Sequence, residues 1–402
     1  MTEPAGTIDL EYLGLDAGAH LLLDRGLRGL APGEAVSVVG TDPALAAHLP
    51  AWCRHRGHGL AAGDGGWTIV RGPAQTQRWA DAVRAGAPGP EGIVARPAAD
   101  WGLAPRGALV EAGGPPLRCA FDERDVVWAD LAPALYAAAA AQQWDPATAI
   151  DWAAHSPADP TDPQAQDAEA ALVQIMTFLV ENEQAALLVP ARLLTQVHPH
   201  FREVVQLLAV QAADEARHVE VFTRRALLGG TPLGTSSVGG RASLATLLAE
   251  PDFALASFLL SVLGEGSFLH LLTFLDRHAP DPVTRQIVRL AHADEARHVA
   301  FGIAHLAHQA RADRGLLDRL RAAAERRHDA LAGTAGLNTD VFDSLVVLAS
   351  PEWSVAGIAL GHARVQALAR DMDAGRRHRL EHLGFPAAEA AEISALHTRN
   401  FM

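Results

Sequence analysis

The hydrophobic pattern divides the chain into a short N-terminal part with strand-like runs and a long C-terminal part with helical periodicity. Ala35 to Val39 and Gly66 to Val70 are apolar runs of strand length, and a helical segment between them begins near Thr41 and runs through Cys53. Short runs rich in β-branched residues and bounded by glycine and proline are typical of strands. Residues 1–72 are therefore predicted to form a small α/β domain.

The next region, residues 73–160, is rich in proline, glycine and alanine. Ala85 to Pro90 and Gly113 to Pro116 are turn signals. We expect an irregular linking region with short strands and one helix near residues 131–143.

The apolar positions of residues 161–402 follow a helical period, and four long helices are expected first. The first spans about 164–197, the second follows Pro199 and ends near 228, the third begins near 251, and the fourth spans about 282–312. A loop rich in glycine, serine and threonine, residues 229–240, separates the two halves. Further amphipathic helices are expected to pack on this bundle at 316–332, 338–348, 352–373 and 386–398.

One heptapeptide, Ala-Asp-Glu-Ala-Arg-His-Val, occurs twice in the helical part, in the second and the fourth long helix. Each copy contains a glutamate and a histidine three residues apart, Glu215 with His218 and Glu295 with His298. This spacing places both side chains on one face of a helix, where they can share a metal ion. A single Glu-x-x-His is usually a solvated pair, but two identical copies in equivalent helices favour a metal site.

Two more glutamates lie in the other two long helices. Glu265 stands between two glycines, and Glu183 lies in an apolar stretch where an unpaired carboxylate would be costly. Glu181 is the alternative to Glu183. We prefer Glu183 because its separation from Glu215 is closer to the separation between Glu265 and Glu295.

This set of residues resembles the ligand set of the ferritin-like carboxylate-bridged di-iron family, in which two helices each give a glutamate and two each give a Glu-x-x-His pair. The resemblance covers the central bundle and rests on Glu183, Glu215, His218, Glu265, Glu295 and His298. It implies two iron ions, with manganese as an alternative, because both metals suit carboxylate and imidazole ligands. The expected fold class is mainly α: a ferritin-like four-helix bundle with extra C-terminal helices, preceded by a small α/β domain.

The resemblance also implies roles for the aspartates that precede the ligand glutamates. Asp214 would accept a hydrogen bond from the ring of His298, and Asp294 from that of His218, which fixes the tautomer of each histidine. Surface charge is the alternative role for both aspartates.

His292 breaks the symmetry between the two halves. It lies three residues before Glu295, and ferritin-like N-oxygenases of aryl amines carry a third histidine four residues before this glutamate. Two roles therefore stay open for His292: a seventh metal ligand, or a histidine that packs beside the site without binding metal.

The N-terminal domain resembles the TusA-type sulfur-carrier fold in its order of elements and in the phrase from Leu49 to His58. The cysteine motif that carries sulfur in that family is missing, because Asp16 to Ala19 stand in its place. We therefore expect a degenerate TusA-like domain that serves in docking or dimerisation, with Cys53 as a buried structural thiol.

Composition narrows the partners and the location. The chain has 402 residues, 49% of them hydrophobic and 20% charged, and a net charge of -14, which argues against nucleic acid and anionic membrane as partners. Cys53 and Cys119 are too few for a disulfide framework, so a reducing cytoplasm is expected. We expect neither a secretory signal nor a membrane span.

Among di-iron functions, we expect an O2-dependent monooxygenase of secondary metabolism. A ribonucleotide reductase radical subunit has a tyrosine near the metals, but Phe222 stands four residues after the first histidine and the chain has only Tyr12 and Tyr136. The alternative is a ferritin-like protein that handles iron or peroxide, or a metal-binding partner protein. The expected oxygenase acts on a small organic molecule, by N-oxygenation of an amine or by C-hydroxylation. Expected partners are this substrate, free or brought by a carrier protein, an external electron donor and a second copy in a homodimer.

Overall fold

The computed structural model describes residues 3–63, 65–332 and 339–396, and the chain divides into two compact units. The first unit comprises residues 1–88 and 100–117, and the second comprises 89–99 and 118–402. Residues 73–160, expected as a linking region, are thus shared between the two units.

A four-stranded sheet with two flanking helices, and a small antiparallel pair of strands, β5 and β6, make up most of the first unit. The sheet has the strand order β1-β2-β4-β3, in which β1 and β2 are parallel and the other neighbours are antiparallel. Its helices contribute Leu23, Leu49 and Cys53 to a separate apolar core. The elements in chain order are β1 (Thr7–Asp9), η1 (Leu15–Ala17), α1 (Ala19–Leu27), β2 (Ala35–Val39), α2 (Leu45–Arg56), β3 (Gly59–Gly63), β4 (Gly66–Val70), α3 (Ala74–Arg78), β5 (Val83–Arg84), η3 (Ala99–Trp101) and β6 (Leu109–Val110).

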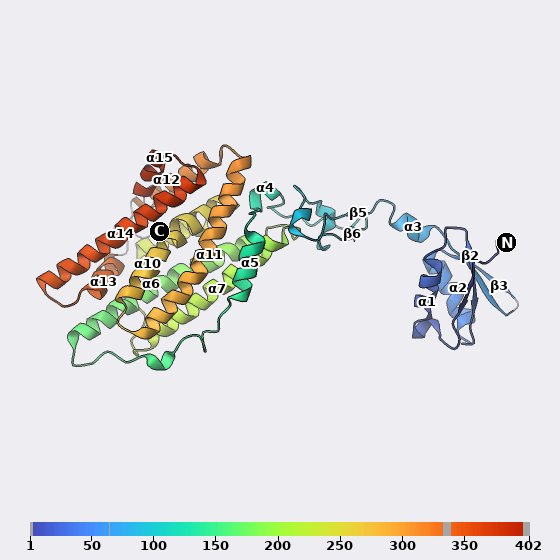
Figure 1. Ribbon diagram of the computed structural model, residues 1–402, viewed down its shortest axis with the longest axis horizontal. Coiled ribbons are helices and arrows are strands. Elements are labelled where there is room, and N and C mark those ends of the chain that lie inside the picture. The colour runs from blue at the N-terminus through green and yellow to red at the C-terminus, as the bar shows by residue number, and fades with distance from the viewer. Residues whose placement is uncertain (1–2, 64, 333–338, 397–402) are drawn as a thin grey trace. The chain divides into compact units, whose positions relative to one another are not determined.

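The second unit is a helical bundle built from two pairs of long helices (Figure 1). The first pair is α6 (Pro163–Leu194) and α7 (Arg202–Leu227); the second is α11 (Pro282–Ala312) and a composite helix of α9 (Phe253–Ser257), η5 (Phe258–Glu265) and α10 (Gly266–His278). Short loops join the helices within each pair, and one long connection joins the pairs. This is the connectivity of ferritin-like bundles, and it confirms the expected fold class.

The same start signal opens a long helix in each half of the bundle. Asp162 caps α6 by accepting a hydrogen bond from Gln164 N, and Asp281 caps α11 by accepting one from Thr284 N. A proline follows each aspartate, at the first helical position, where its missing N–H is not needed. The two aspartates therefore fix where α6 and α11 begin.

Further helices pack around the bundle. C-terminal helices cover it at the four places expected from the sequence, although α14 extends further than expected. The elements are η2 (Pro90–Gly92), α4 (Arg124–Val127), α5 (Ala132–Ala141), η4 (Trp152–Ala154), α8 (Val238–Leu248), α12 (Leu316–Ala332), α13 (Thr339–Ala349), α14 (Val355–Leu383) and α15 (Ala387–Ala395).

Two features of the bundle were missed by the sequence pattern. The segment η5 is π-helical, with the wider turn that places an extra residue in the helix. The helix α8 begins within the stretch expected as a loop and packs against α6 and α12. Both features border the site described below.

Among the described residues, two segments are long and apolar enough to cross a membrane, α6 and the composite helix Phe253–His278, but 67% and 83% of their most apolar windows are buried inside the protein. Their hydrophobicity is that of helices in the centre of a bundle.

Candidate metal centre

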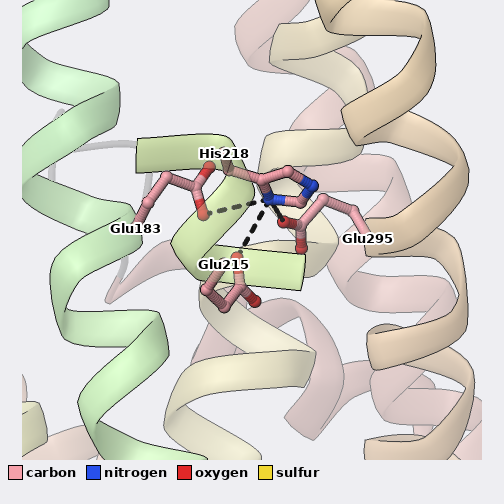
Figure 2. Close-up of side chains that lie close together, drawn as sticks. All are labelled: Glu183, Glu215, His218 and Glu295. Carbon is pink, nitrogen blue, oxygen red and sulfur yellow. Dashed lines mark hydrogen bonds and ion pairs between the residues drawn. The ribbon is translucent and has the colours of Figure 1, made fainter. Parts of the chain in front are cut away.

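Six acidic and imidazole side chains meet between the four long helices, and none of them is more than 5% exposed. They form two groups that share Glu215 and Glu295, each able to hold a metal ion. The first group adds Glu183 and His218 (Figure 2), and the second adds Glu265 and His298.

The two shared glutamates stand between the two histidines. His218 Nδ1 lies 3.0 Å from Glu215 Oε2 and 3.2 Å from Glu295 Oε1. His298 Nδ1 lies 3.0 Å from Glu215 Oε1 and 3.5 Å from Glu295 Oε2. Each of these carboxylates therefore presents one oxygen to His218 and the other to His298, so both glutamates could help to hold two cations.

Glu183 and Glu265 complete the outer sides of the two groups. Glu183 Oε2 lies 3.6 Å from His218 Nδ1, and Glu265 Oε1 accepts a hydrogen bond of 3.1 Å from the buried amide of Gln211. Because Glu265 is the last residue of η5, the π-helical turn directly precedes this ligand position.

Several of the gathered atoms are buried and make no well-aligned hydrogen bond, although all but one of them lie in ion-pair contact with a neighbouring ligand residue. They are Glu215 Oε1, Glu265 Oε2, both carboxylate oxygens of Glu295 and His298 Nδ1. Buried polar atoms are normally satisfied, so these atoms fit a role as metal ligands.

Electrostatics agree with that role. Burial raises the pKa of Glu183 and of Glu265 well above the usual carboxylate range, and the carboxylates of Glu215 and Glu295 raise both further. Burial opposes charge on Glu215, His218 and His298 as well, but their mutual ion pairs prevail: the pKa of Glu215 is lowered and the histidine pKa values are raised. In the metal-free protein, protons on Glu183, Glu265 and the two histidines thus offset the negative charge that two cations could offset.

The other nitrogen of each histidine is held by an aspartate from the opposite helix. His218 Nε2 lies 3.2 Å from Asp294 Oδ2, and His298 Nε2 lies 3.2 Å from Asp214 Oδ2. These are the crosswise pairs expected from the sequence. They point both Nδ1 atoms at the shared glutamates and fix the orientation of the rings.

The aspartates are held in turn by the segment that follows α5. Gln143 Nε2 donates to Asp214 Oδ1 at 2.9 Å, and Trp144 Nε1 donates to Asp294 Oδ2 at 2.8 Å. Arg217 forms ion pairs with both aspartates and lies 4.8 Å from the centre of the Trp144 ring. No sequence spacing links residues 143 and 144 to the repeated heptapeptide, so this support could not be predicted.

The histidine with the open role, His292, belongs to neither group of gathered residues. Positions 292 and 298 lie on opposite sides of Glu295 around the helix, about 120° apart at 3.6 residues per turn. His292 is half-buried. It lies near His270 of α10, whose pKa is lowered mainly by burial, then by two arginines, and to a smaller extent by His292. The position four residues before Glu295 is the fully buried Ala291.

The structure also places Glu181 and Phe222, two positions discussed in the sequence analysis. Glu181, the alternative to Glu183, is turned away from the centre and accepts a hydrogen bond from Ser236 Oγ. Phe222 is fully buried with its ring centre 6.2 Å from that of His218, so the place of a radical tyrosine holds a phenyl ring.

A narrow, largely apolar cavity of about 20 Å³ adjoins the gathered carboxylates. Glu183, Glu265 and Glu295 form its acidic side. Apolar residues of α6, α8, η5 and α10 form most of the remaining wall, namely Ala186, Leu244, Leu247, Leu259, Leu260, Gly264 and Phe268. A small apolar molecule in this cavity would lie directly beside the metal site.

No family model matches the sequence, and no curated protein matches it. Among solved structures, the chain is similar to R2-like ligand-binding oxidase with an aerobically reconstituted Mn/Fe cofactor (long soak), at 21% identity and a TM-score of 0.44 over 68% of this chain and 94% of that chain. A single-residue variant of R2-like ligand-binding oxidase, with the same kind of cofactor, gives 19% identity and a TM-score of 0.47 over 63% of this chain and 94% of that chain. At these values the likeness assigns neither a family nor an activity to this chain.

Proposed function

We propose that the helical unit is a non-heme di-iron oxygenase that uses O2 to oxygenate a small organic molecule, by N-oxygenation or C-hydroxylation, in secondary metabolism. The observation that carries the proposal is the apolar cavity lined by three of the gathered carboxylates, Glu183, Glu265 and Glu295. A site for iron alone has no need of an apolar cavity beside the metals.

The donor set favours iron, with manganese as the alternative. Four carboxylates and two imidazoles are hard and borderline ligands, which suit these metals better than thiophilic ones. The described residues of both metal groups include no cysteine. When bound, two ferrous ions supply the electrons that convert O2 into an oxidant.

The chain's own residues position and enclose the reaction. Asp214 and Asp294 hold the two histidine rings, so that each keeps a nitrogen directed at the shared glutamates. Leu244, Leu247 and Leu260 exclude water from the substrate side and leave an apolar molecule as the favoured occupant.

The choice between nitrogen and carbon as the oxidised atom does not rest on His292. That histidine lies outside both metal groups, and its replacement by alanine is expected to leave the iron content unchanged. N-oxygenation of an amine and C-hydroxylation are both compatible with a narrow apolar cavity.

The competing function is iron or peroxide handling, and the reaction of the ferrous protein with O2 separates the two. Protein loaded anaerobically with iron is mixed rapidly with O2, with and without a panel of small amines and alkyl aromatic compounds, and absorption and products are followed. A transient visible absorption whose decay is accelerated by a panel member, together with an oxygenated product, supports the oxygenase. Steady accumulation of ferric mineral, with no product, would establish iron storage instead.

A variant that fills the cavity provides the control. Gly264 lines the cavity, and a Cβ added there meets only the Leu259 carbonyl oxygen, at 3.4 Å. Gly264→Leu should therefore keep two irons and the reaction with O2 but lose the acceleration by substrate. Equal acceleration in this variant would show that the cavity does not hold the substrate.

A further inference from the structure

The cavity beside the metal centre contains one polar residue that is not a carboxylate. Asn182 lies on α6, directly before Glu183, and is 7% exposed. Together with Ala186, one turn further along, Asn182 and Glu183 form the part of the cavity wall that α6 supplies. The metal centre itself makes no use of Asn182.

One hydrogen bond fixes the orientation of the Asn182 amide. Its Nδ2 donates to the carbonyl oxygen of Phe178, at 2.7 Å. The flipped amide would place two oxygens against each other, so the assignment of nitrogen and oxygen follows from the contact. The remaining polar atom, Oδ1, is buried and has no hydrogen-bond partner.

A buried hydrogen-bond acceptor without a partner, such as Asn182 Oδ1, favours a bound molecule that carries a hydrogen-bond donor. Asn182 Oδ1 lost its hydrogen bonds to water when the protein folded, and an occupant that donates an N–H or O–H restores one of them. An occupant without a donor leaves the oxygen unsatisfied, and sites of this kind reject such analogues strongly. The apolar residues of the wall, such as Leu247 and Phe268, offer no alternative partner.

We infer that Asn182 is a specificity-determining residue, and that the molecule bound in the cavity is a small, largely apolar compound with one uncharged N–H or O–H donor, which Asn182 Oδ1 accepts. This inference rests on the proposed function only in calling the bound molecule a substrate. Asn182 and Glu183 both line the cavity, so the donor end of the molecule lies at the wall that α6 supplies.

Binding of three probes of similar size tests the inference without any turnover. Aniline and phenol each carry a donor, and toluene replaces the donor by a methyl group. Dissociation constants are measured by calorimetry under anaerobic conditions, for ferrous-loaded and for metal-free protein. The wild-type protein is expected to bind aniline and phenol at least tenfold more tightly than toluene in both forms.

Two variants remove the acceptor. Asn182→Leu keeps the branched shape and the number of side-chain heavy atoms but is larger, and Asn182→Ala serves if leucine disturbs folding, which circular dichroism and iron content will show. Either variant should abolish the preference for aniline and phenol and leave toluene binding equal or stronger. Thr273→Val is the matched control, because Thr273 Oγ1 donates to the carbonyl of Leu269 four residues back, as Asn182 does to Phe178, but does not line the cavity.

Three results would overturn the inference: no binding of any probe, equal binding of all three to the wild-type protein, or a preference that survives in Asn182→Leu and Asn182→Ala. A preference seen only with iron and independent of Asn182 belongs to direct coordination by the metals and also overturns it. Failure of the proposed function would give another result. A protein that stores iron and oxygenates nothing would still show the Asn182-dependent preference for aniline and phenol over toluene.

Discussion

Glu295 uses both carboxylate oxygens at the metal centre, one toward each histidine. Its replacement by alanine should therefore disturb both metal positions at once. We expect the wild-type protein to hold two irons per chain after anaerobic ferrous reconstitution and Glu295→Ala to retain less than half of that amount, measured by a ferrous chelator assay. Glu220→Ala, at an exposed position of α7, is the control and should keep both irons. Iron near zero in the wild-type protein would contradict the metal centre itself.

The buried protons of the metal-free centre predict how stability depends on pH. The pKa values of His218 and His298 are raised in the folded protein. Their contribution to the free energy of unfolding is therefore full below about pH 6.5, the usual histidine pKa, and is lost as the pH rises through their pKa values in the folded protein. The raised pKa of Glu183 acts in the same direction, because the folded protein holds its proton more tightly. The free energy of unfolding of metal-free protein should therefore fall as the pH rises above about 6.5.

Urea denaturation in the presence of a chelator, over a series of pH values, measures this slope. Glu183→Gln keeps a neutral side chain at every pH and should flatten the slope. Protein loaded with iron should show a weaker dependence, since the cations replace the protons. A metal-free protein that becomes more stable above pH 6.5 would contradict the raised pKa values.

Residues that follow a repeat could be predicted, and residues that depend on packing could not. Glu215, His218, Glu295 and His298 stand in a repeated string whose spacing places them on one helix face, and the structure brings them together. Spacing also distinguished Glu183 from Glu181. Asn182 gave no signal, because a single asparagine in an apolar helix has no partner in the sequence that would mark it as lining a cavity.

At the scale of elements, the π-helical segment η5 approaches α11 closely at Gly302. A Cβ on Gly302 would lie 2.4 Å from Ser261 Cβ, which belongs to the rigid start of a side chain and cannot move aside alone. Gly302→Ala should therefore destabilise the protein, by about 1–3 kcal/mol as for other overpacked cores. Gly264→Ala is the matched control, since its Cβ has room, and it should change stability by less than about 1 kcal/mol. Urea denaturation of both variants checks this, and equal stabilities would contradict the close packing.

The segment after α5 supports the centre through Trp144. Burial opposes the charge of Asp294, but its hydrogen bond with His218 and the one it accepts from Trp144 help to lower its pKa to about 2. Trp144→Phe removes the second of these bonds and frees the aspartate to move. The affinity for iron should fall about tenfold, the lower end of the effect seen when such supporting partners are lost.

Trp152→Phe is the matched control for Trp144→Phe. The Trp152 ring also lies against an arginine, with Arg224 3.9 Å from its centre, and its Nε1 donates to the Pro146 carbonyl oxygen and not to an aspartate of the centre. Iron affinity, measured by competition with a chelator, should be unchanged in this variant. Equal losses in the two variants would show that a general disturbance of residues 142–154 is responsible.

The sequence predicted helix boundaries correctly where capping residues mark them. It failed where no capping residue or other side chain marks the boundary. The Asp-Pro starts of α6 and α11 are visible in the sequence, and both helices begin at the expected places. The π-helical turn of η5, which packs against α11, has no residue signature in the sequence. The helix α8 begins in a run of serine and glycine that also suits a loop, and its N-cap, Ser237, became recognisable only in the structure.

At the scale of the whole molecule, the two units have separate apolar cores. The core of the first unit lies between its sheet, α1 and α2, whereas all six gathered metal-site residues belong to the second unit. We propose that the first unit docks a partner or a second copy of the chain and takes no part in the chemistry. Deletion of residues 1–72 should then leave iron content and the reaction with O2 unchanged.

The same deletion should alter assembly, because docking or dimerisation is the role proposed for the first unit. Cys53, the cysteine of the first unit, is 1% exposed. Burial raises the pKa of its thiol to about 11, so the thiolate that sulfur transfer would need is disfavoured. Sedimentation velocity of the full chain and of the deleted chain measures the change, and a dimer is expected only for the full chain. A deleted chain with the same sedimentation behaviour and the same turnover, with electron donor and substrate supplied, would exclude both docking and dimerisation through this unit.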